Sequence, residues 1–158
     1  MATLPENRAA EIMTIEVIYM EPDDHVSTAW DFMKEYSFRH IPIVENFQLR
    51  GIISDRDILR HTGSATKLPN LPLEQIMTKD PISVTEDCPL DQICTLMLEE
   101  KINCLPIVGT GGTLSGLITS SDLIDLLRYL VSQMSDDALP TYQYDIKPYS
   151  QYEESQLY

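Results

Sequence analysis

Two stretches of the chain carry apolar residues at the spacing of one face of a helix. These residues are Val26, Ala29, Trp30 and Met33 in the first stretch, and Leu90, Ile93, Cys94 and Met97 in the second. Asp23 and Asp24 precede the first stretch as candidate N-caps. Asp87 precedes the second, where Pro89 suits the first helical turn. The pattern therefore predicts two short amphipathic helices.

Short apolar runs without helical spacing lie on both sides of each predicted helix. Residues 17–20 and 82–84 come before the helices and are rich in β-prone side chains. The runs that follow the helices are residues 41–44, 51–53, 107–108 and 116–118, with Asn46 or Gly111-Gly112 marking the turns between them. Two further helices are expected over residues 55–60 and 120–130. The order β-α-β-β-α occurs twice and predicts a mixed α/β (α+β) fold.

The two units are copies of one another. Ile12-Met13-Thr14 recurs 64 residues later as Ile76-Met77-Thr78, and residues 41–44 match residues 105–108 at the same offset. After one inserted residue the offset becomes 65, and Gly51 through Asp57 match Gly116 through Asp122. A unit that cannot bury its apolar face alone buries it against its copy. We therefore expect two pseudo-symmetric repeats packed as one module.

The repeats divide the chain into five segments. The expected boundaries are an N-terminal extension (1–9), the first repeat (10–62), a linker (63–72), the second repeat (73–134) and a tail (135–158). The linker is rich in small residues and proline, as a connection between repeats should be. The tail is acidic, lacks a clear period and holds five of the eight tyrosines. Two readings stay open for it: a disordered end, or a segment that packs on a partner subunit.

The composition narrows the classes of partner and compartment. The formal net charge is −14, which argues against nucleic acid or an anionic membrane surface as a partner, because both need basic patches. No run approaches the ~18 apolar residues of a membrane span, and no apolar secretory signal is evident near the start. Cys88, Cys94 and Cys104 form no CxxC pair, so we expect reduced thiols, no metal site and a cytoplasmic location.

One duplicated motif carries candidate chemistry, Gly-h-h-Ser/Thr-x-x-Asp, in which h is an apolar residue and x is any residue. Ser54 or Thr119 stands where a strand becomes a helix, and free N–H groups there favour an anion. Asp57 and Asp122 lie one helical turn further on, on the same side. A carboxylate there can accept two hydrogen bonds from a ribose diol. The same spacing also fits a helix capping box with Asp in place of Glu, so the motif alone leaves both roles open.

The duplicated order of these motifs resembles a tandem CBS-domain pair, often called a Bateman module. The shared features are the Ile-Met-Thr start, the central h-Pro-Ile-Val strand and the closing glycine motif, and the resemblance covers about residues 10–130. It implies two clefts between the repeats that take adenosyl ligands such as AMP, ADP, ATP or S-adenosylmethionine. It also implies dimers shaped like a flat disc. The resemblance therefore predicts a regulatory sensor with no obligatory cofactor.

The resemblance also implies which residues meet in each cleft. One cleft would combine Thr119 and Asp122 with Thr14, Tyr19, Phe38, Arg39 and His40. The other would combine Ser54 and Asp57 with Thr78, Ser83, Ile102, Asn103 and Cys104. Arg39 supplies a planar donor array suited to phosphate, and His40 can add a proton. Since Asn103 and Cys104 carry no charge, we expect the Asp122 cleft to prefer phosphate-bearing ligands.

Catalysis is not predicted. His25, His40 and His61 sit in no metal-ligand pattern, and the chain has no GxSxG, P-loop or dinucleotide fingerprint. The alternative to a sensor is a protein-interaction module that acts through its dimer surface and whose clefts bind no ligand. In both cases we expect a homodimer formed through the helices of both repeats. A regulated protein is a further expected partner that the sequence does not identify.

Overall fold

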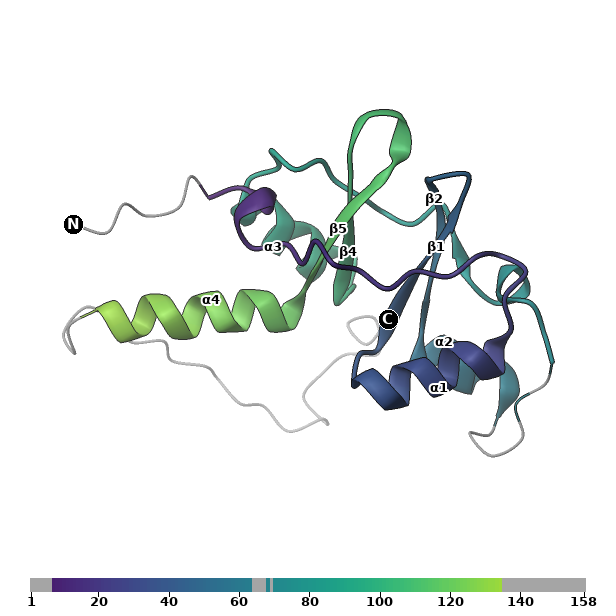
Figure 1. The fold of residues 1–158 in the computed structure, drawn as a ribbon. Coiled ribbons are helices and arrows are strands. Elements are labelled where there is room, and N and C mark those ends of the chain that lie inside the picture. Colours follow the sequence, from purple (N-terminus) through teal and green to yellow (C-terminus); the bar gives the residue numbers. More distant parts are fainter. Residues whose placement is uncertain (1–6, 64–67, 69, 135–158) are drawn as a thin grey trace, which may run out of the picture.

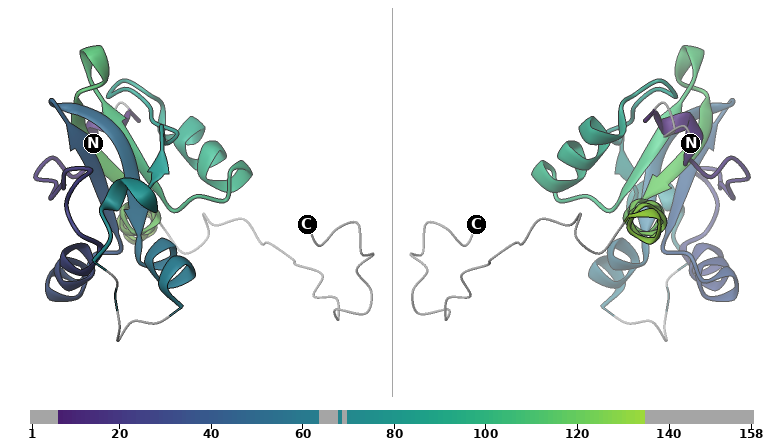
Figure 2. Two further views of the ribbon diagram at one scale, coloured as in Figure 1. Left: turned by 90° about the vertical axis from the view of Figure 1, so that its right-hand side faces the viewer. Right: turned by 90° about the vertical axis from the view of Figure 1, so that its left-hand side faces the viewer.

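The fold is built from two strand pairs that lie side by side, with helices around them (Figures 1 and 2). A computed structural model describes residues 7–63, 68 and 70–134. The expected mixed α+β fold of two repeats is confirmed. The expectations for the tail from residue 135 onward lie outside the described residues.

In the first repeat, helix α1 (Val26–Tyr36) leads into the antiparallel pair β1 (His40–Glu45) and β2 (Gln48–Ser54), and α2 (Asp55–Thr62) follows without a break. The predicted stripe of α1 faces the core, since Val26, Ala29 and Met33 are buried. Four consecutive residues of β1 are also buried, which explains their continuous apolar run.

The second repeat follows the same plan. Helix α3 (Leu90–Glu99) leads into β4 (Cys104–Val108) and β5 (Leu114–Thr119), joined by a short 3-10 turn (Thr110–Gly112), and α4 (Ser120–Gln133) follows. Both strand pairs shift register at the same place, between Ile43 and Val44 and between Ile107 and Val108. A shared bulge shows that the duplication extends to the backbone geometry.

The first residues of each repeat pair with a strand of the other repeat. Thr14 forms a bridge to Leu117 in β5, while β3 (Thr78–Lys79) pairs with β2. The 3-10 turn Ala9–Glu11 places Ala9 in the core of the second repeat, and the turn Leu73–Gln75 places Leu73 in the core of the first. Two apolar cores result, and each is completed by a segment from the opposite repeat.

Two glycines permit this exchange. A Cβ atom on Gly116 would lie 2.8 Å from the carbonyl oxygen of Thr14, and one on Gly51 would lie 2.5 Å from the sulfur of Met77. The glycine of the duplicated motif is therefore needed where the start of the other repeat crosses the strand.

Two details of the predicted elements were wrong. The β-prone runs at 17–20 and 82–84 form only single parallel bridges, from Met20 to Ile43 and from Val84 to Ile107. The predicted N-caps are also displaced. Helix α1 begins after His25, because the Asp24 carboxylate accepts a hydrogen bond from the Glu21 backbone instead.

Helix α3 shows the same displacement. Its N-cap is Pro89, which was expected inside the first turn, and the Asp87 carboxylate accepts a hydrogen bond from the Thr85 hydroxyl. In both repeats, the acidic residues before the helix stabilise the preceding turn rather than the helix start.

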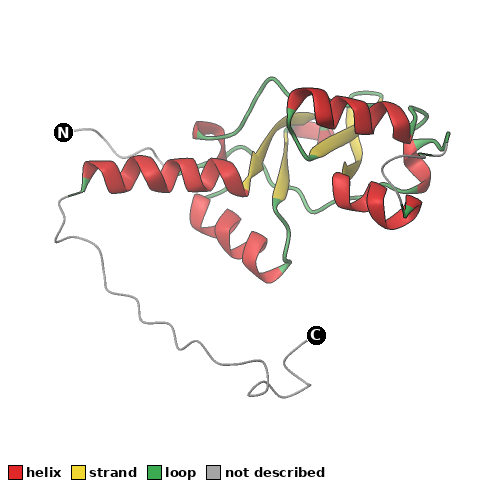
Figure 3. Cartoon of the chain, turned by 90° about the horizontal axis from the view of Figure 1, so that it is seen from below, coloured by secondary structure: helices red, strands yellow, loops and turns green. Residues whose placement is uncertain are grey.

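Helix α4 differs most from its counterpart α2. It has 14 residues against eight, buries none of them fully, and projects beyond the strands (Figures 1 and 3). Leu123 and Leu126 are partly buried against the second core, whereas Ile124 and Leu127 are 65% and 58% exposed. Among the described residues, no helix is long and apolar enough to cross a membrane.

Candidate functional site

Two clefts lie where the repeats meet, each at the start of the last helix of one repeat. The Asp57 cleft has a volume of about 300 Å³ and the Asp122 cleft about 240 Å³. The first volume is at the lower end of the range for small-molecule sites, roughly 300–1,000 Å³, and the second is slightly below it. The exchange of first residues explains their mixed walls, since Thr14 lines the Asp122 cleft and Thr78 lines the Asp57 cleft.

The structure brings most of the predicted residues together. The Asp57 cleft is lined by Ser54, Asp57, Thr78, Ile102, Asn103 and Cys104, and the Asp122 cleft by Thr14, Phe38, Arg39, His40, Thr119 and Asp122. Tyr36, Val17 and Glu16 add to the Asp122 cleft, so its wall includes two aromatic rings and one further carboxylate. Tyr36 stacks on Phe38 with a centroid separation of 6.1 Å.

Tyr19 and Ser83 do not line the clefts in which they were expected. Tyr19 instead lines a separate groove with Phe47 and Leu114 at the turn end of the strand pairs. The physical reason is that residues 17–19 form irregular backbone between the bridges at Thr14 and Met20, so their side chains do not follow the regular alternation of a strand. Val17 borders both the Asp122 cleft and the separate groove, Ile18 lines the Asp122 cleft, and Tyr19 lines the groove.

Both aspartates of the duplicated motif cap helices. One carboxylate oxygen of Asp57, Oδ2, accepts hydrogen bonds from the Ser54 backbone N–H (2.9 Å) and hydroxyl (2.6 Å). Asp122 Oδ2 accepts the corresponding bonds from Thr119 at 2.7 and 2.8 Å. The capping box is therefore present in both repeats. Within the described residues these capping bonds all use Oδ2 and leave Oδ1 to a ligand, so capping and ligand binding are compatible in one carboxylate.

His40 and Cys104 occupy equivalent positions but differ in placement. His40 lines both clefts, whereas Cys104 lines only the Asp57 cleft. Burial lowers the pKa of His40, Arg39 and Arg56 lower it further, and the carboxylates of Asp55 and Asp57 oppose them. The unliganded ring is thus less easily protonated than the sequence argument assumed. Burial, aided by Asp122, raises the pKa of the Cys104 thiol to about 12, so this thiol is unreactive.

The comparison of charge between the clefts was wrong. Arg56, Arg60 and Lys101 all line the Asp57 cleft, which the sequence argument treated as lacking cations. Arg39 is the cation of the Asp122 cleft, and Glu16 lines the same cleft. The sequence did contain a signal: Arg56 and Arg60 are four residues apart on the predicted helix that carries Asp57, and such residues share a face.

Metal ligands are not gathered in the described part of the chain, where no group of three or more His, Cys, Asp or Glu side chains could hold an ion. The candidate site is therefore a pair of clefts whose walls offer carboxylates, guanidinium groups, an amine and aromatic faces.

Known sequences and structures share this organisation. The family described as CBS domain matches residues 9–63 and 73–129. Inosine-5'-monophosphate dehydrogenase from Methanocaldococcus jannaschii is 32% identical over 123 residues, which cover 77% of this chain and 24% of that enzyme. The chain thus spans about a quarter of the length of this relative.

Two solved structures are similar over most of their own length. The AcuB protein from Vibrio cholerae has 31% identity and a TM-score of 0.74, with 80% of this chain and 95% of that chain covered. The CBS domain pair of protein MJ0100, in complex with 5'-methylthioadenosine and S-adenosyl-L-methionine, has 26% identity and a TM-score of 0.71. The similarity to MJ0100 covers 80% of this chain and 99% of that one.

Proposed function

The chain belongs to the CBS-domain family, and we propose that it is a regulatory module that binds an adenosyl ligand between its two repeats. The observation that carries the proposal is the pair of clefts, each with an aspartate at a helix start facing the first residues of the other repeat. The similar domain pair of MJ0100, which holds two adenosyl compounds, supports the same ligand class.

The two aspartates are the proposed ribose contacts. Because Oδ2 of each carboxylate is held by the helix cap, the side chain is fixed before a ligand arrives and loses little freedom on binding. Oδ1 then accepts hydrogen bonds from the ribose hydroxyls, which are charge-assisted and stronger than neutral ones. The apolar residues of the other repeat, Ile102 in one cleft and Phe38 in the other, would cover the base.

A ligand in either cleft touches both repeats, which is the basis for a regulatory role. A ligand that contacts both repeats favours the arrangement of the repeats in which both walls of the cleft can touch it. A protein partner that recognises that arrangement would then respond to the ligand concentration. Residues in the wall of the cleft between the repeats are suited to transmit the change. Four of them lie in loops or strands: His40, Thr78, Asn103 and Cys104.

Ligand-dependent stability tests the proposal. The full chain is heated alone and with adenosine, AMP, ADP, ATP, S-adenosylmethionine or 5'-methylthioadenosine, and hits are titrated by calorimetry. A ligand at about 100 times its dissociation constant stabilises the folded state by about 2.7 kcal/mol. Guanosine and cytidine serve as controls for the base. The absence of a shift with every adenosyl compound would contradict the proposal.

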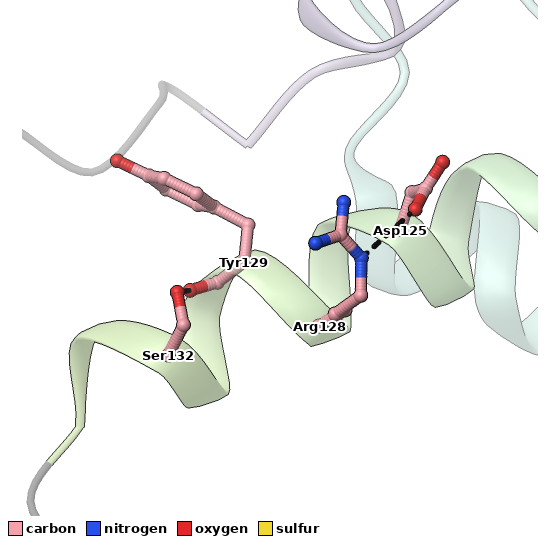
Figure 4. A network of polar contacts seen from close by, with 4 residues as sticks. All are labelled: Asp125, Arg128, Tyr129 and Ser132. Atoms are coloured by element: carbon pink, nitrogen blue, oxygen red, sulfur yellow. Dashed lines mark hydrogen bonds and ion pairs between the residues drawn. The ribbon is translucent and has the colours of Figure 1, made fainter.

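A second candidate function is a homodimeric interaction module, favoured by the surface of α4. Ile124 and Leu127 are exposed, and Tyr129 projects from the same helix beyond the ion pair of Asp125 and Arg128 (Figure 4). Exposed apolar side chains on a helix with few contacts inside the chain indicate a surface that another subunit covers in the assembly. Sedimentation of the parent and of Ile124→Glu/Leu127→Glu tests it: the parent should be a dimer and the variant a monomer. A parent that stays monomeric at micromolar concentrations would contradict this candidate.

A further inference from the structure

We infer that the Asp57 cleft is selective for polyphosphates: it takes a nucleoside diphosphate or triphosphate in preference to the monophosphate or the free nucleoside, and Arg56, Arg60 and Lys101 determine this preference. The inference rests on the proposed adenosyl site and adds the chemical class of its ligand. It also reverses the order of the clefts that the sequence suggested.

The first observation is the convergence of three cations in one cleft. Arg56 and Arg60 come from α2 of the first repeat, and Lys101 comes from the residues before β4 in the second. Three of the 11 lysines and arginines in a chain of net charge −14 therefore line one cleft, and they come from both repeats. A ligand anion placed between them would contact both repeats at once.

The second observation is that, within the described residues, none of the three cations forms an ion pair, although Asp57 lines the same cleft. In the part of the chain that the structure describes, ion pairs hold Lys34, Arg50 and Arg128, each beside a carboxylate within 3.3 Å, and none involves the three cleft cations. Like charges that converge without a counter-ion repel one another, and a multivalent anion removes that repulsion. Guanidinium groups also bind phosphate oxygens in a bidentate manner.

The third observation comes from the internal repeat. At the offset of 65, Arg56 and Arg60 correspond to Ser121 and Asp125 on α4. At the offset of 64, Lys101 corresponds to Ser37, and the two residues share a left-handed backbone with φ of 54° and 59°. The three positions that carry cations in the Asp57 cleft thus carry no cation at their counterparts in the other repeat.

The Asp122 cleft provides the internal contrast. Its cation, Arg39, lies in a cleft that also contains Glu16 and Asp122, so carboxylates outnumber guanidinium groups among its lining residues. A second or third phosphate would meet repulsion there, whereas an uncharged or zwitterionic adenosyl compound would not. Selectivity between the clefts therefore follows from exposed side chains and not from the backbone.

Calorimetric titration of the full chain tests the inference with adenosine, AMP, ADP, ATP, S-adenosylmethionine and inorganic tripolyphosphate. The variant is Arg56→Gln/Arg60→Gln/Lys101→Gln, in which all three sites are exposed and tolerate the change. The matched control is Lys34→Gln/Arg50→Gln/Arg128→Gln, which removes three exposed cations outside both clefts. Thermal unfolding checks that both proteins are folded.

In the parent and the control, ATP and ADP should bind more tightly than AMP, and the preference should weaken as salt is added. In the triple variant, ATP affinity should fall by roughly 30- to 100-fold, about the loss of one or two charge-assisted contacts. Its affinity for adenosine should stay within about twofold of the parent, since no ribose or base contact is changed.

Two results would overturn the inference while leaving the proposed function intact. One is equal affinity of the parent for adenosine, AMP and ATP. The other is a triple variant that keeps the full ATP preference. If tripolyphosphate bound and none of the adenosyl compounds did, the result would support the anion site and contradict the proposed adenosyl function. The absence of binding by every compound would contradict both.

Discussion

The two clefts share one backbone plan but differ in charge. Each places an aspartate in a capping box, a glycine at a chain crossing and the first residues of the other repeat in its wall. Around Asp57 the equivalent exposed positions carry Arg56, Arg60 and Lys101, and around Asp122 they carry uncharged or acidic residues. Under the inference drawn above, the shared backbone plan places the ligand, and the exposed side chains around it decide which ligand is favoured.

The largest expected effect comes from removing either aspartate. Asp57→Ala should lower the affinity for ATP at its own cleft by about 100-fold or more, because two charge-assisted bonds are lost. Binding at the other cleft should be unchanged. Asp122→Ala should abolish binding of an uncharged or zwitterionic adenosyl compound at its own cleft and leave ATP binding at the Asp57 cleft unchanged. Each variant should also lose about 1 kcal/mol of stability with its helix cap.

The control for this pair is Asp24→Ala, which removes a turn-stabilising carboxylate that lines neither cleft. It should lower the unfolding temperature without changing either titration. If Asp57→Ala weakened both clefts equally, the clefts could not be treated as separate sites.

The crossing glycines offer the next largest effect, on stability. Gly116→Ala should cost roughly 1–3 kcal/mol, as overpacking usually does, because its Cβ would meet the Thr14 carbonyl oxygen. Gly51→Ala should cost less, since its closest contact is the flexible side chain of Met77. Urea unfolding of the two variants measures the difference, and equal losses would mean that the two crossings are equally rigid.

Moving the three cations to the equivalent positions of the other repeat tests the difference between the clefts directly. Ser37→Lys/Ser121→Arg/Asp125→Arg places the cations of one cleft at the equivalent positions of the other. We expect ATP affinity at the Asp122 cleft to rise by about tenfold, in line with one added charge-assisted contact. Titration in the Asp57→Ala background isolates this cleft. Unchanged affinity would show that the backbone positions are not equivalent for the ligand.

The smallest expected effect concerns His40, which lines both clefts. Because burial lowers its pKa in the folded state, the unfolded chain takes up the proton first. Its contribution to the free energy of unfolding is therefore complete above about pH 6.5 and is lost as the pH falls towards the folded pKa. His40→Gln should lose less stability than the parent between about pH 7.5 and pH 5.5. A parallel decline in both proteins would contradict this role for His40.

The duplicated sequence predicted the strands β1, β2, β4 and β5 and the helices, because these depend on repeated apolar patterns. The mixed walls of the clefts were predicted by the family resemblance and not by the apolar patterns. It failed at Asp24 and Asp87, where short-range hydrogen bonds in the turns outcompeted helix capping. It also failed for Tyr19, because a few residues of irregular backbone decide which side chain faces the cleft.

The cations of the Asp57 cleft were missed for a different reason. The positions that the family resemblance implies include Asn103 and Cys104 but not Arg56 and Arg60. The structure shows that Arg56 and Arg60 of α2 line a cleft together with residues of the opposite repeat.

The exchange of first residues has a consequence for synthesis. The ribosome delivers Ala9 long before the core that it completes, and the core of the first repeat waits for Leu73 and Ile76. Neither half is a finished folding unit until the other has emerged. Within one chain the partner segments meet at millimolar effective concentration. A cut between residues 63 and 72 would turn this internal exchange into association of two fragments, whose stability would depend on their concentration.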